Sequence, residues 1–508
     1  MINHDNPDQI EIVDFILPFS GRLNPGNKWI RLSKMIPWEE LAGRYTRKMC
    51  KDFGRLSIKP RVAIGALIIK HFKQMSDEET IEEIQENPYL QYFLGYSGYQ
   101  IKPCFDASLF VTIRKRLSAR QIEAINGVFI MKVNELRQIE KEAKHSGRRS
   151  RSSRGNDAQS GKSAQNEPPN KGKLIVDATV ASSNIKYPTD LDLLNQSREI
   201  SEGLIDKLYS GGRFEEKPRT YRQKARQSFL GIIKKKRKSH KLLRQGIKRQ
   251  LQYLRRNLNH IDNMLKRYGD NPDILSARDI QRLKTVRMIF SQQEQMFREG
   301  THSVEDRIVS IHQPQVRPIV RGKAGADVEF GAKISLSVVD RLVSLDRLKW
   351  DAFNENQDLI AQVNKYRRRY GFFPAVVIAD GIYGTRENRQ YLRKYGIRFS
   401  GKKVGRPPKE IDAIFREMER LRRIEQGERN EIEGKIGTAK TRYGLGKVMA
   451  KTEATSENWI AMAIFSMNMA TALRQLLLSL FYGLKNWGEF LANLGQVWNN
   501  PVILLTVR

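Results

Sequence analysis

Three acidic residues stand at positions where a folded chain could bring carboxylates together. Asp177 lies within the apolar, β-branched run KLIVDATVA, and Asp380 ends the similar run PAVVIAD. Glu433 belongs to a polar segment with helical spacing, RNEIEGKIGTAKTRYGLGK. Two strand aspartates and a helical glutamate could hold two Mg²⁺ ions, because this cation prefers oxygen ligands. Such a metal pair activates the attacking oxygen and stabilises the leaving oxygen in phosphodiester displacement.

Two cations share the helical segment that carries Glu433. Arg429 precedes this glutamate by four residues, and Lys440 follows it by seven. On an α-helix these spacings put all three side chains on roughly one side. The pattern therefore predicts a helical face with a carboxylate between two positive charges.

Other acidic residues compete for the same roles. Glu431 is two residues from Glu433, and Asp190 and Asp192 follow the strand of Asp177. An aspartate after an apolar run is often a turn or cap residue, and an arginine four residues before a glutamate is often a surface ion pair. The order of the three acidic positions on a strongly basic chain favours Asp177, Asp380 and Glu433 over these competitors.

The elements that must position these residues are strands and helices of one sheet. Short apolar, β-branched runs predict strands at 173–181, 374–380 and 396–402. The segment 328–350 predicts a strand pair with its turn at Asp340–Arg341. We expect a mixed α/β sheet whose strand ends present the aspartates.

The chain has 508 residues, enough for about three or four domains at the usual domain size. Its composition changes several times along the sequence. From the N-terminus, we expect a helical domain for DNA binding or dimerisation (1–140), a disordered basic linker (141–172) and an α/β catalytic core in two segments (173–188 and 311–475). We expect a basic helical insertion between the two core segments (189–310) and a helical C-terminal tail (476–508).

The insertion has the spacing of paired helices. Its apolar residues alternate spacings of four and three, as in a heptad repeat, at Ile247, Leu251, Leu254, Leu258, Ile261 and Leu265. The GDNP motif at 269–272 should end this helix, and apolar residues from Ile280 to Phe297 predict a returning helix. We expect a helical hairpin or a small bundle, because an unstructured loop of this length would be implausible.

The formal net charge is +34 and the isoelectric point about 10.1. Such a balance indicates a polyanionic partner, with nucleic acid the first candidate and an anionic membrane surface the second. Residues 213–267 alone hold nineteen Lys or Arg and three Asp or Glu, a net charge of +16. We expect the densest run to bind DNA phosphates with a strong salt dependence. This run comprises Lys234, Lys235, Lys236, Arg237 and Lys238.

Several classes of protein are disfavoured. Two cysteines make no disulfide framework and fit a reducing cytosolic compartment, and seven unclustered histidines provide no zinc site. The apolar segment 459–481 is interrupted by Asn468, Arg474 and Gln475, which predicts a buried helix of a soluble core and not a membrane span. The N-terminal MINHDNPDQIEIVDF lacks the pattern of a signal peptide.

With these blocks in this order, the chain resembles a DDE transposase of bacterial insertion sequences, of the insertion-sequence-five-like type. That group carries a Tyr-x2-Arg-x3-Glu-x6-Lys signature, which Arg429, Glu433 and Lys440 match, whereas Gln426 stands at the tyrosine position. IVDAT and IADGIYGT resemble the strands of the first and second aspartates, and VRPIVRGKAGADVEFGAKISLSV the strand pair between them. FDASLFVTIRKRL resembles the end of the helical N-terminal domain. The resemblance covers most of residues 20–475.

The resemblance implies an RNase H-like mixed-sheet core in which Asp177, Asp380 and Glu433 hold two Mg²⁺ or Mn²⁺ ions. One metal would lower the pKa of the water that cuts DNA at the element's end, and the freed 3′ hydroxyl would attack target DNA. Arg429 and Lys440 would contact phosphates or orient the glutamate. The resemblance also implies a homodimer that acts on terminal inverted repeats at the nucleoid of the bacterial cytoplasm, away from any membrane.

The residues by themselves predict less, namely a basic, metal-using phosphodiester enzyme with a helical DNA-binding part. Three alternatives stay open. The first is an RNase H-like endonuclease without strand transfer, and the second is a catalytically inactive DNA-binding descendant. The third is a structural coiled-coil or ribosome-associated basic protein. All three expected acidic positions hold an Asp or Glu, which argues against the inactive descendant. The predicted strands argue against the coiled-coil or ribosome-associated protein.

Overall fold

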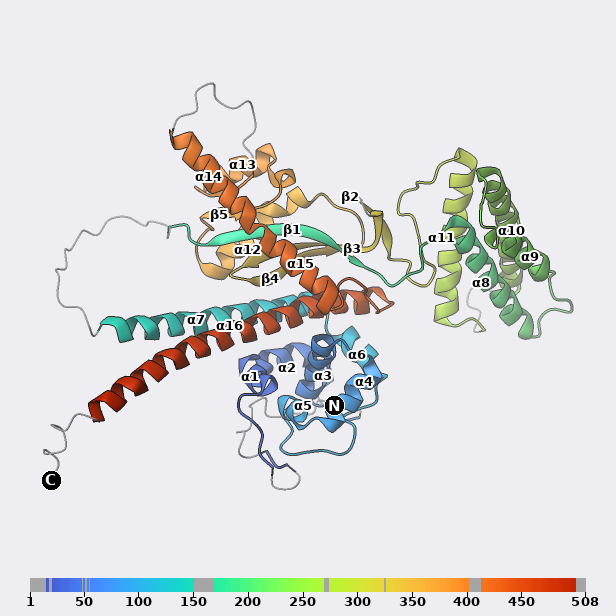
Figure 1. Ribbon diagram of the computed structural model, residues 1–508. Coiled ribbons are helices and arrows are strands. Elements are labelled where there is room, and N and C mark those ends of the chain that lie inside the picture. The colour runs from blue at the N-terminus through green and yellow to red at the C-terminus, as the bar shows by residue number, and fades with distance from the viewer. Residues whose placement is uncertain are drawn as a thin grey trace.

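The computed structural model describes residues 15–17, 21–47, 49, 50, 53, 55–149, 169–268, 274–323, 326–401 and 413–498. Within these ranges, a group of N-terminal helices lies below a mixed sheet, and four further helices form a bundle to one side of it (Figure 1). Two long helices, α7 (Ala119–Arg149) and α16 (Glu453–Trp498), run side by side between the other N-terminal helices and the sheet.

The N-terminal helices are α1 (Lys28–Met35), α2 (Trp38–Thr46), α3 (Pro60–Lys73), α4 (Asp77–Glu86), α5 (Pro88–Phe93), α6 (Leu109–Arg116) and α7 (Ala119–Arg149). Helix α4 begins with a capping box, in which the backbone N–H of Glu79 donates to Ser76 Oγ at 3.1 Å and that of Ser76 donates to Glu79 Oε2 at 2.7 Å. This reciprocal bonding satisfies two amides that the helix start would otherwise leave unpaired.

Helix α7 ends at Arg149, nine residues into the segment 141–172 that the composition predicts as a disordered linker. The helix replaces the linker there because the first of these residues, Lys-Glu-Ala-Lys, are all good helix formers. Residues 150–168 of the predicted linker lie outside the described residues.

The sheet contains β1 (Lys173–Ser182), β2 (Arg317–Lys323), β3 (Ala326–Val339), β4 (Leu342–Lys349), β5 (Val376–Ile378) and β6 (Arg398–Phe399). The order is β2-β3-β1-β5-β6, and β4 pairs with the second half of β3. Strand β3 runs antiparallel to β1, β2 and β4, whereas β5 and β6 run parallel to β1. The predicted strands are therefore confirmed. The β3–β4 turn is also at Asp340–Arg341, where both residues have positive φ, as a two-residue hairpin turn of type I′ requires.

Helices cover both faces of the sheet. They are η3 (Glu355–Asp358), α12 (Leu359–Tyr370), η4 (Gly381–Tyr383), α13 (Arg386–Lys394), α14 (Ala413–Glu428), α15 (Asn430–Arg442) and α16 (Glu453–Trp498). Side chains of β1 alternate between the faces. Val176 packs in a cluster with Val363 of α12 and Leu392 of α13, whereas Ile175 belongs to a larger cluster with Ile432 of α15.

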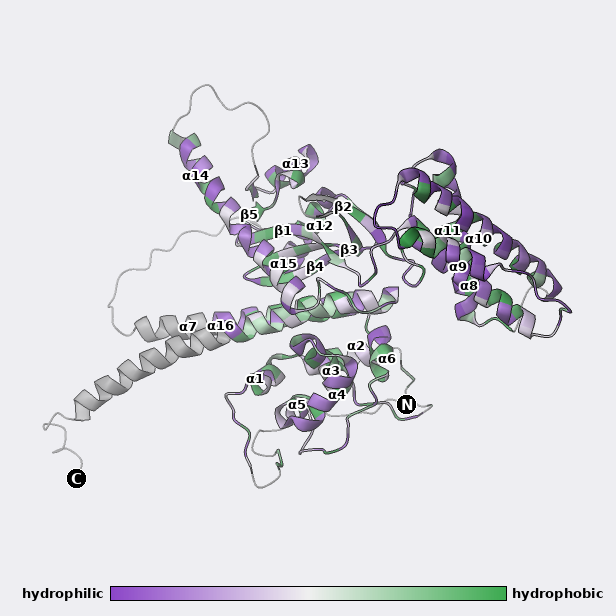
Figure 2. Cartoon of the chain, turned by 45° about the vertical axis from the view of Figure 1, so that its right-hand side comes forward, coloured by the Kyte–Doolittle hydropathy of each residue, from purple (hydrophilic) through white to green (hydrophobic). Residues whose placement is uncertain are grey.

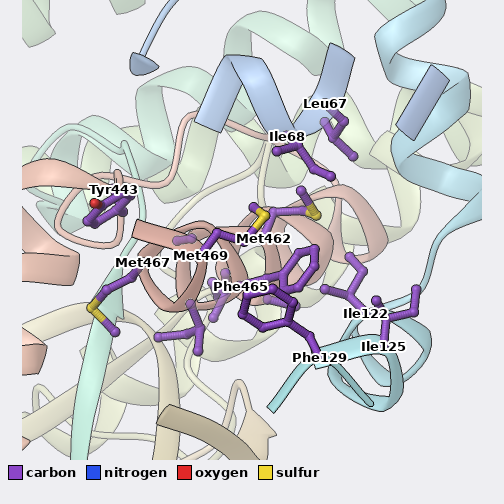
Figure 3. Packing of buried hydrophobic residues seen from close by; sticks show 14 of the residues in the cluster. Leu67, Ile68, Ile122, Ile125, Phe129, Tyr443, Met462, Phe465, Met467 and Met469 are labelled. Carbon is purple, nitrogen blue, oxygen red and sulfur yellow. The ribbon is translucent and has the colours of Figure 1, made fainter. Parts of the chain in front are cut away.

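Helix α16 is the centre of that larger cluster (Figure 3). The ring of Phe465 meets that of Phe129 of α7 edge to face, with centroids 5.6 Å apart. Asn468 interrupts the apolar surface because its amide pairs with the edge strand β4. Its Oδ1 accepts from the Val343 N–H at 2.8 Å, and its Nδ2 donates to the Val343 carbonyl at 2.6 Å. In the described part of the chain, no helix has the length and apolarity needed to cross a membrane.

The bundle consists of α8 (Asp190–Ser210), α9 (Arg222–Ile233), α10 (His240–Tyr268) and α11 (Ala277–Glu299). Its interior is a hydrophobic cluster of its own, in which the central heptad positions Leu251, Leu254, Leu258 and Ile261 are buried as their spacing predicts. Its outer surface is largely hydrophilic (Figure 2). The GDNP motif lies outside the described residues, just after α10 ends at Tyr268.

Candidate active site

Strand register brings the first two predicted carboxylates to one end of the sheet. Ile175 of β1 pairs with Ile378 of β5, and the two strands are parallel. Asp177 and Asp380 each follow two residues later, so they stand at equivalent positions on neighbouring strands. Asp177 is half-buried within β1, and the Asp380 side chain is 59% exposed just beyond β5.

Hydrogen bonds fix the backbone that carries Asp380. The carboxylate caps the short helix η4, with its Oδ1 accepting from the Gly381 N–H at 2.5 Å. From α14, Gln426 Nε2 donates to the carbonyl of Ala379 at 3.2 Å and to that of Ser400 at 3.1 Å. Gln426 thus ties α14 to the ends of β5 and β6. Sequence reasoning noted it as a departure from a signature and did not find this positioning role, since an amide at one helical position carries no signal of a non-local bond.

Arg429 joins the second and third predicted carboxylates. This residue stands immediately before α15, and its Nη1 lies 3.2 Å from Asp380 Oδ1 while its Nη2 donates to Glu433 Oε1 at 2.5 Å. The Glu433 side chain is 48% exposed. Burial would lower the pKa of Arg429, but the bond to Glu433 and the charges of Asp380, Glu433 and Asp177 raise it. The guanidinium is therefore held charged at the meeting point of three carboxylates.

Asp177 lies in the same electrostatic field. Burial raises the pKa of its carboxyl, the charges of Glu355 and Glu433 raise it further, and the Ala178 N–H and Arg429 oppose this shift. Glu355, which sequence reasoning missed, belongs to η3 and pairs with Lys333 Nζ at 3.0 Å. A four-residue 3₁₀ helix leaves no periodic pattern in a sequence, so only the fold reveals this fourth carboxylate near the site.

Tyr383 lies beneath the acidic residues and was also missed. Its ring is fully buried, and in the described part of the chain its hydroxyl has no hydrogen-bond partner. Burial strongly raises the pKa of this phenol, and the nearby charges of Glu355 and Asp177 raise it further. The phenol therefore stays neutral, and its ring packs in the cluster of Val176 and Leu392.

Lys440 lies two helical turns beyond Glu433, about 10 Å along the α15 axis at 1.5 Å per residue. Its Nζ is 3.8 Å from Glu329 Oε2 of β3. The predicted helical face therefore carries Arg429, Glu433 and Lys440 in line, and the first two are in contact.

The competing acidic residues have other surroundings. In α8, Asp190 accepts from Arg307 Nη2 at 2.7 Å and Asp192 pairs with Lys186 Nζ at 2.6 Å. Glu431 is about 200° around α15 from Glu433 and acts on Lys435, where its charge opposes the lowering of the pKa by burial. These contacts favour Asp177 and Glu433 as the site residues.

The predicted DNA-binding run lies far along the chain from this edge, in the connection between α9 and α10. All five side chains are exposed, and none has a carboxylate within 4.0 Å among the residues that the structure describes. The run consists of Lys234, Lys235, Lys236, Arg237 and Lys238.

The donor set agrees in type with a hard divalent cation, since its groups are carboxylate oxygens. Across the described ranges, however, no group of three or more His, Cys, Asp or Glu is arranged to hold a metal ion. Two of the three predicted ligands, Asp380 and Glu433, instead pair with Arg429. A bound metal would therefore share these oxygens with the guanidinium or displace it.

Comparison with known proteins finds transposase domains at two places in the chain. A family model described as "Transposase DDE domain" matches residues 377–470, and one described as "Transposase domain (DUF772)" matches residues 18–116. The first range includes Asp380 and Glu433 but not Asp177. Together the two matches support a DDE-type transposase of insertion sequences.

A curated relative is the "Uncharacterized protein ORF8 in nfe locus" of Rhizobium meliloti, which is 34% identical over 106 residues, or 20% of this chain and 49% of the relative. The chain thus spans about half the length of this relative. No solved structure matches significantly.

Proposed function

We propose that this protein, with its two matched transposase domains, is a DNA transposase that cleaves the ends of an insertion sequence and joins them to target DNA. One observation carries the proposal. Asp177 and Asp380 stand at equivalent positions on neighbouring parallel strands, and Arg429 of the adjoining helix pairs with both Asp380 and Glu433. Phosphoryl transfer needs this kind of convergence, because its catalysis is mostly positioning and charge stabilisation.

In this proposal, the oxygens of Asp177, Asp380 and Glu433 would hold two Mg²⁺ or Mn²⁺ ions. When bound, such ions activate an attacking oxygen and stabilise the leaving one. Arg429 orients Asp380 and Glu433 before binding, since it already pairs with both. Lys440, two turns along the same helix face, would contact a DNA phosphate next to the cut.

We further propose that the core is RNase H-like. Support comes from the strand arrangement, in which β3 runs antiparallel to both β1 and β4, and β5 and β6 continue the sheet parallel to β1. The finer group, the insertion-sequence-five-like type, rests on the spacing of Arg429, Glu433 and Lys440. The helical insertion between β1 and β2 and the N-terminal helices then serve DNA binding or dimerisation.

The proposed partners are terminal inverted repeats and target DNA, bound by a homodimer at the bacterial nucleoid in the cytoplasm. The net charge of +34 supports a DNA partner, because a large excess of cations attracts a polyanion and gains free energy from counterion release.

Labelled DNA carrying the sequence that flanks the coding region tests the function. With Mg²⁺ or Mn²⁺ the full chain should cut this DNA and join the freed 3′ end to a second, unlabelled DNA. Cleavage without joining would instead identify an endonuclease, and DNA binding without cleavage would identify an inactive descendant.

A further inference from the structure

A groove of about 800 Å³ lies where the bundle meets the sheet. The chain segments after β1 and before β2 form its core side, together with Lys451 before α16, while α8 and α11 form its bundle side. We call it the junction groove and define it by six of its lining residues, Lys186, Tyr187, Arg278, Arg282, His312 and Lys451.

The junction groove has an excess of unneutralised positive charge. Its lining includes one carboxylate, Asp192, which pairs with Lys186 at 2.6 Å. Arg278, Arg282 and Lys451 have no carboxylate within 4.0 Å in the described part of the chain. This concentration of like charge is costly unless an anion enters.

The pKa of His312 is affected by the same excess of positive charge. Burial lowers the pKa of its imidazole, and the charges of Arg282, Lys451 and Arg278 lower it further. No carboxylate acts in the opposite direction on this histidine. The three cations thus reach one point of the groove from both of its sides.

An exposed aromatic ring adds a second kind of contact. Tyr187 is 71% exposed, and its ring stands edge to face on Phe330 with centroids 5.5 Å apart. Grooves that bind nucleic-acid strands combine backbone-tracking cations with aromatic rings on which bases stack. A small inorganic anion would use the cations but not the ring.

The junction groove lies in line with the acidic residues. Strand β1 runs from Asp177 to Ser182, where the groove segment begins, a length of about 17 Å at roughly 3.3 Å per residue. This distance equals about five base steps of DNA at 3.4 Å each. Lys440 lies on the same side, paired with Glu329 next to Phe330.

We propose that the junction groove binds the phosphodiester backbone of a DNA strand, at a point about five nucleotides from the phosphate that is cut. Arg278, Arg282 and Lys451 contact phosphates, and Tyr187 stacks on a base. This site is distinct from the run Lys234–Lys238, and the inference rests on the proposed function.

Two double variants of the full chain with the same change of charge test the cations. Arg278→Gln/Arg282→Gln removes groove charges, whereas Lys284→Gln/Arg298→Gln removes two exposed cations of α11 that do not line the groove. The probe is a duplex of about 40 base pairs, roughly 140 Å long, from the DNA that flanks the coding region, with one end left single-stranded so that unpaired bases can stack. The slope of log affinity against log salt should fall by about two in the groove variant and by clearly less in the control. Equal changes in the two variants would overturn the inference.

Tyr187 provides a second readout that charge does not affect. Tyr187→Ala should weaken binding of the same probe about fivefold or more, and Tyr187→Phe, which keeps the stacking face, should restore it. An Ala variant that binds like the native chain would exclude the stacking contact. If the native chain binds and cuts the probe but all groove variants behave like their controls, only the proposed role of the junction groove is wrong. A native chain that does not bind the probe would overturn the proposed function as well.

Discussion

The two largest hydrophobic clusters among the described residues, one joining the N-terminal helices to the sheet and one inside the bundle, are built in opposite ways. The larger one joins Leu67 and Phe129 of the N-terminal helices, Ile334 of the sheet, Ile432 of α15 and Phe465 of α16, which are far apart in the sequence. The bundle interior comes from α8, α10 and α11, which are neighbours along the chain. The acidic residues therefore depend on long-range packing, whereas the bundle is a locally packed attachment with a separate interior.

The pairing of charges also differs between one cluster of the N-terminal part and one run of the bundle. In the N-terminal part, Asp77 pairs with both nitrogens of Arg114, at 2.9 and 2.7 Å, and with Lys70 at 2.9 Å. In the bundle, the run Lys234–Lys238 is exposed and, within the described ranges, without carboxylate partners. The bundle also has ion pairs, such as Lys207 with Asp279 at 2.7 Å, so the contrast is between the buried cluster around Asp77 and this one exposed run.

The largest effect should come from the larger interior. Phe465→Ala removes a fully buried ring and its contact with Phe129, which should cost about 3–5 kcal/mol of unfolding free energy. Calorimetry should show the unfolding transition of the core at a lower temperature. DNA cleavage should then be lost at moderate temperature, because the core unfolds. Phe465→Leu, which keeps most of the volume, should cost less than about 1.5 kcal/mol. Equal losses in the two variants would contradict this packing.

The bundle should respond separately. Leu254→Ala in its interior should cost about 3 kcal/mol, but the change should appear in the unfolding of the bundle and leave the core transition in place. Lys248→Ala, an exposed change on the same helix, is the control and should stay within about 0.5 kcal/mol. If both transitions shift together in Leu254→Ala, the two interiors are one cooperative unit.

Breaking the buried charge cluster should have a smaller, pH-dependent effect. Burial would raise the pKa of Asp77, but Arg114 and Lys70 lower it below 3.8. Arg114, which donates two hydrogen bonds to this carboxylate, lowers its pKa more than Lys70 does. Asp77→Asn should cost about 2 kcal/mol above pH 3.8.

The difference between the native chain and Asp77→Asn should disappear as the pH falls through the lowered pKa, since a depressed carboxyl pKa stabilises the folded state only while the group is ionised. Urea unfolding of both proteins at several pH values measures this difference in unfolding free energy. Glu78→Gln removes an exposed charge from the same helical turn and serves as control. A constant difference down to strongly acidic pH would exclude the proposed ion pairing.

The smallest effect on folding should come from the free charges. Replacing Lys234–Lys238 by glutamine should leave the unfolding free energy within about 0.5 kcal/mol. The salt dependence of DNA binding should nevertheless become weaker, by about 0.9 in slope for each DNA phosphate that the variant no longer neutralises. An unchanged slope would show that this exposed run does not touch DNA.

The features that local sequence determines were predictable. Strands around Asp177 and before Asp380, the hairpin turn at Asp340 and the heptad face of α10 all follow from spacing within a few residues, and the structure confirms each of them. The polar residue Asn468 within an apolar helix also agreed with a buried position and not with a membrane span.

The pairing of distant segments was not predictable in the same way. No local pattern reports that Ile175 pairs with Ile378 or that Gln426 bonds to Ala379. The ion pair between Arg429 and Asp380 likewise needs both strands and α15 in place. The sequence alone therefore predicted which carboxylates could form the site. Only the fold shows that Glu355 is close enough to act on the charge of Asp177.

Cleavage of labelled element-end DNA by isosteric variants tests the central claim most directly. Asp177→Asn, Asp380→Asn and Glu433→Gln should each lower the rate by at least about 10²-fold, the loss typical of removing one group that stabilises transition-state charge. DNA affinity should stay nearly unchanged, and Glu431→Gln on the same helix should cut normally. A native rate in any of the three variants, or an equal loss in Glu431→Gln, would contradict the convergence of these carboxylates on the reacting phosphate.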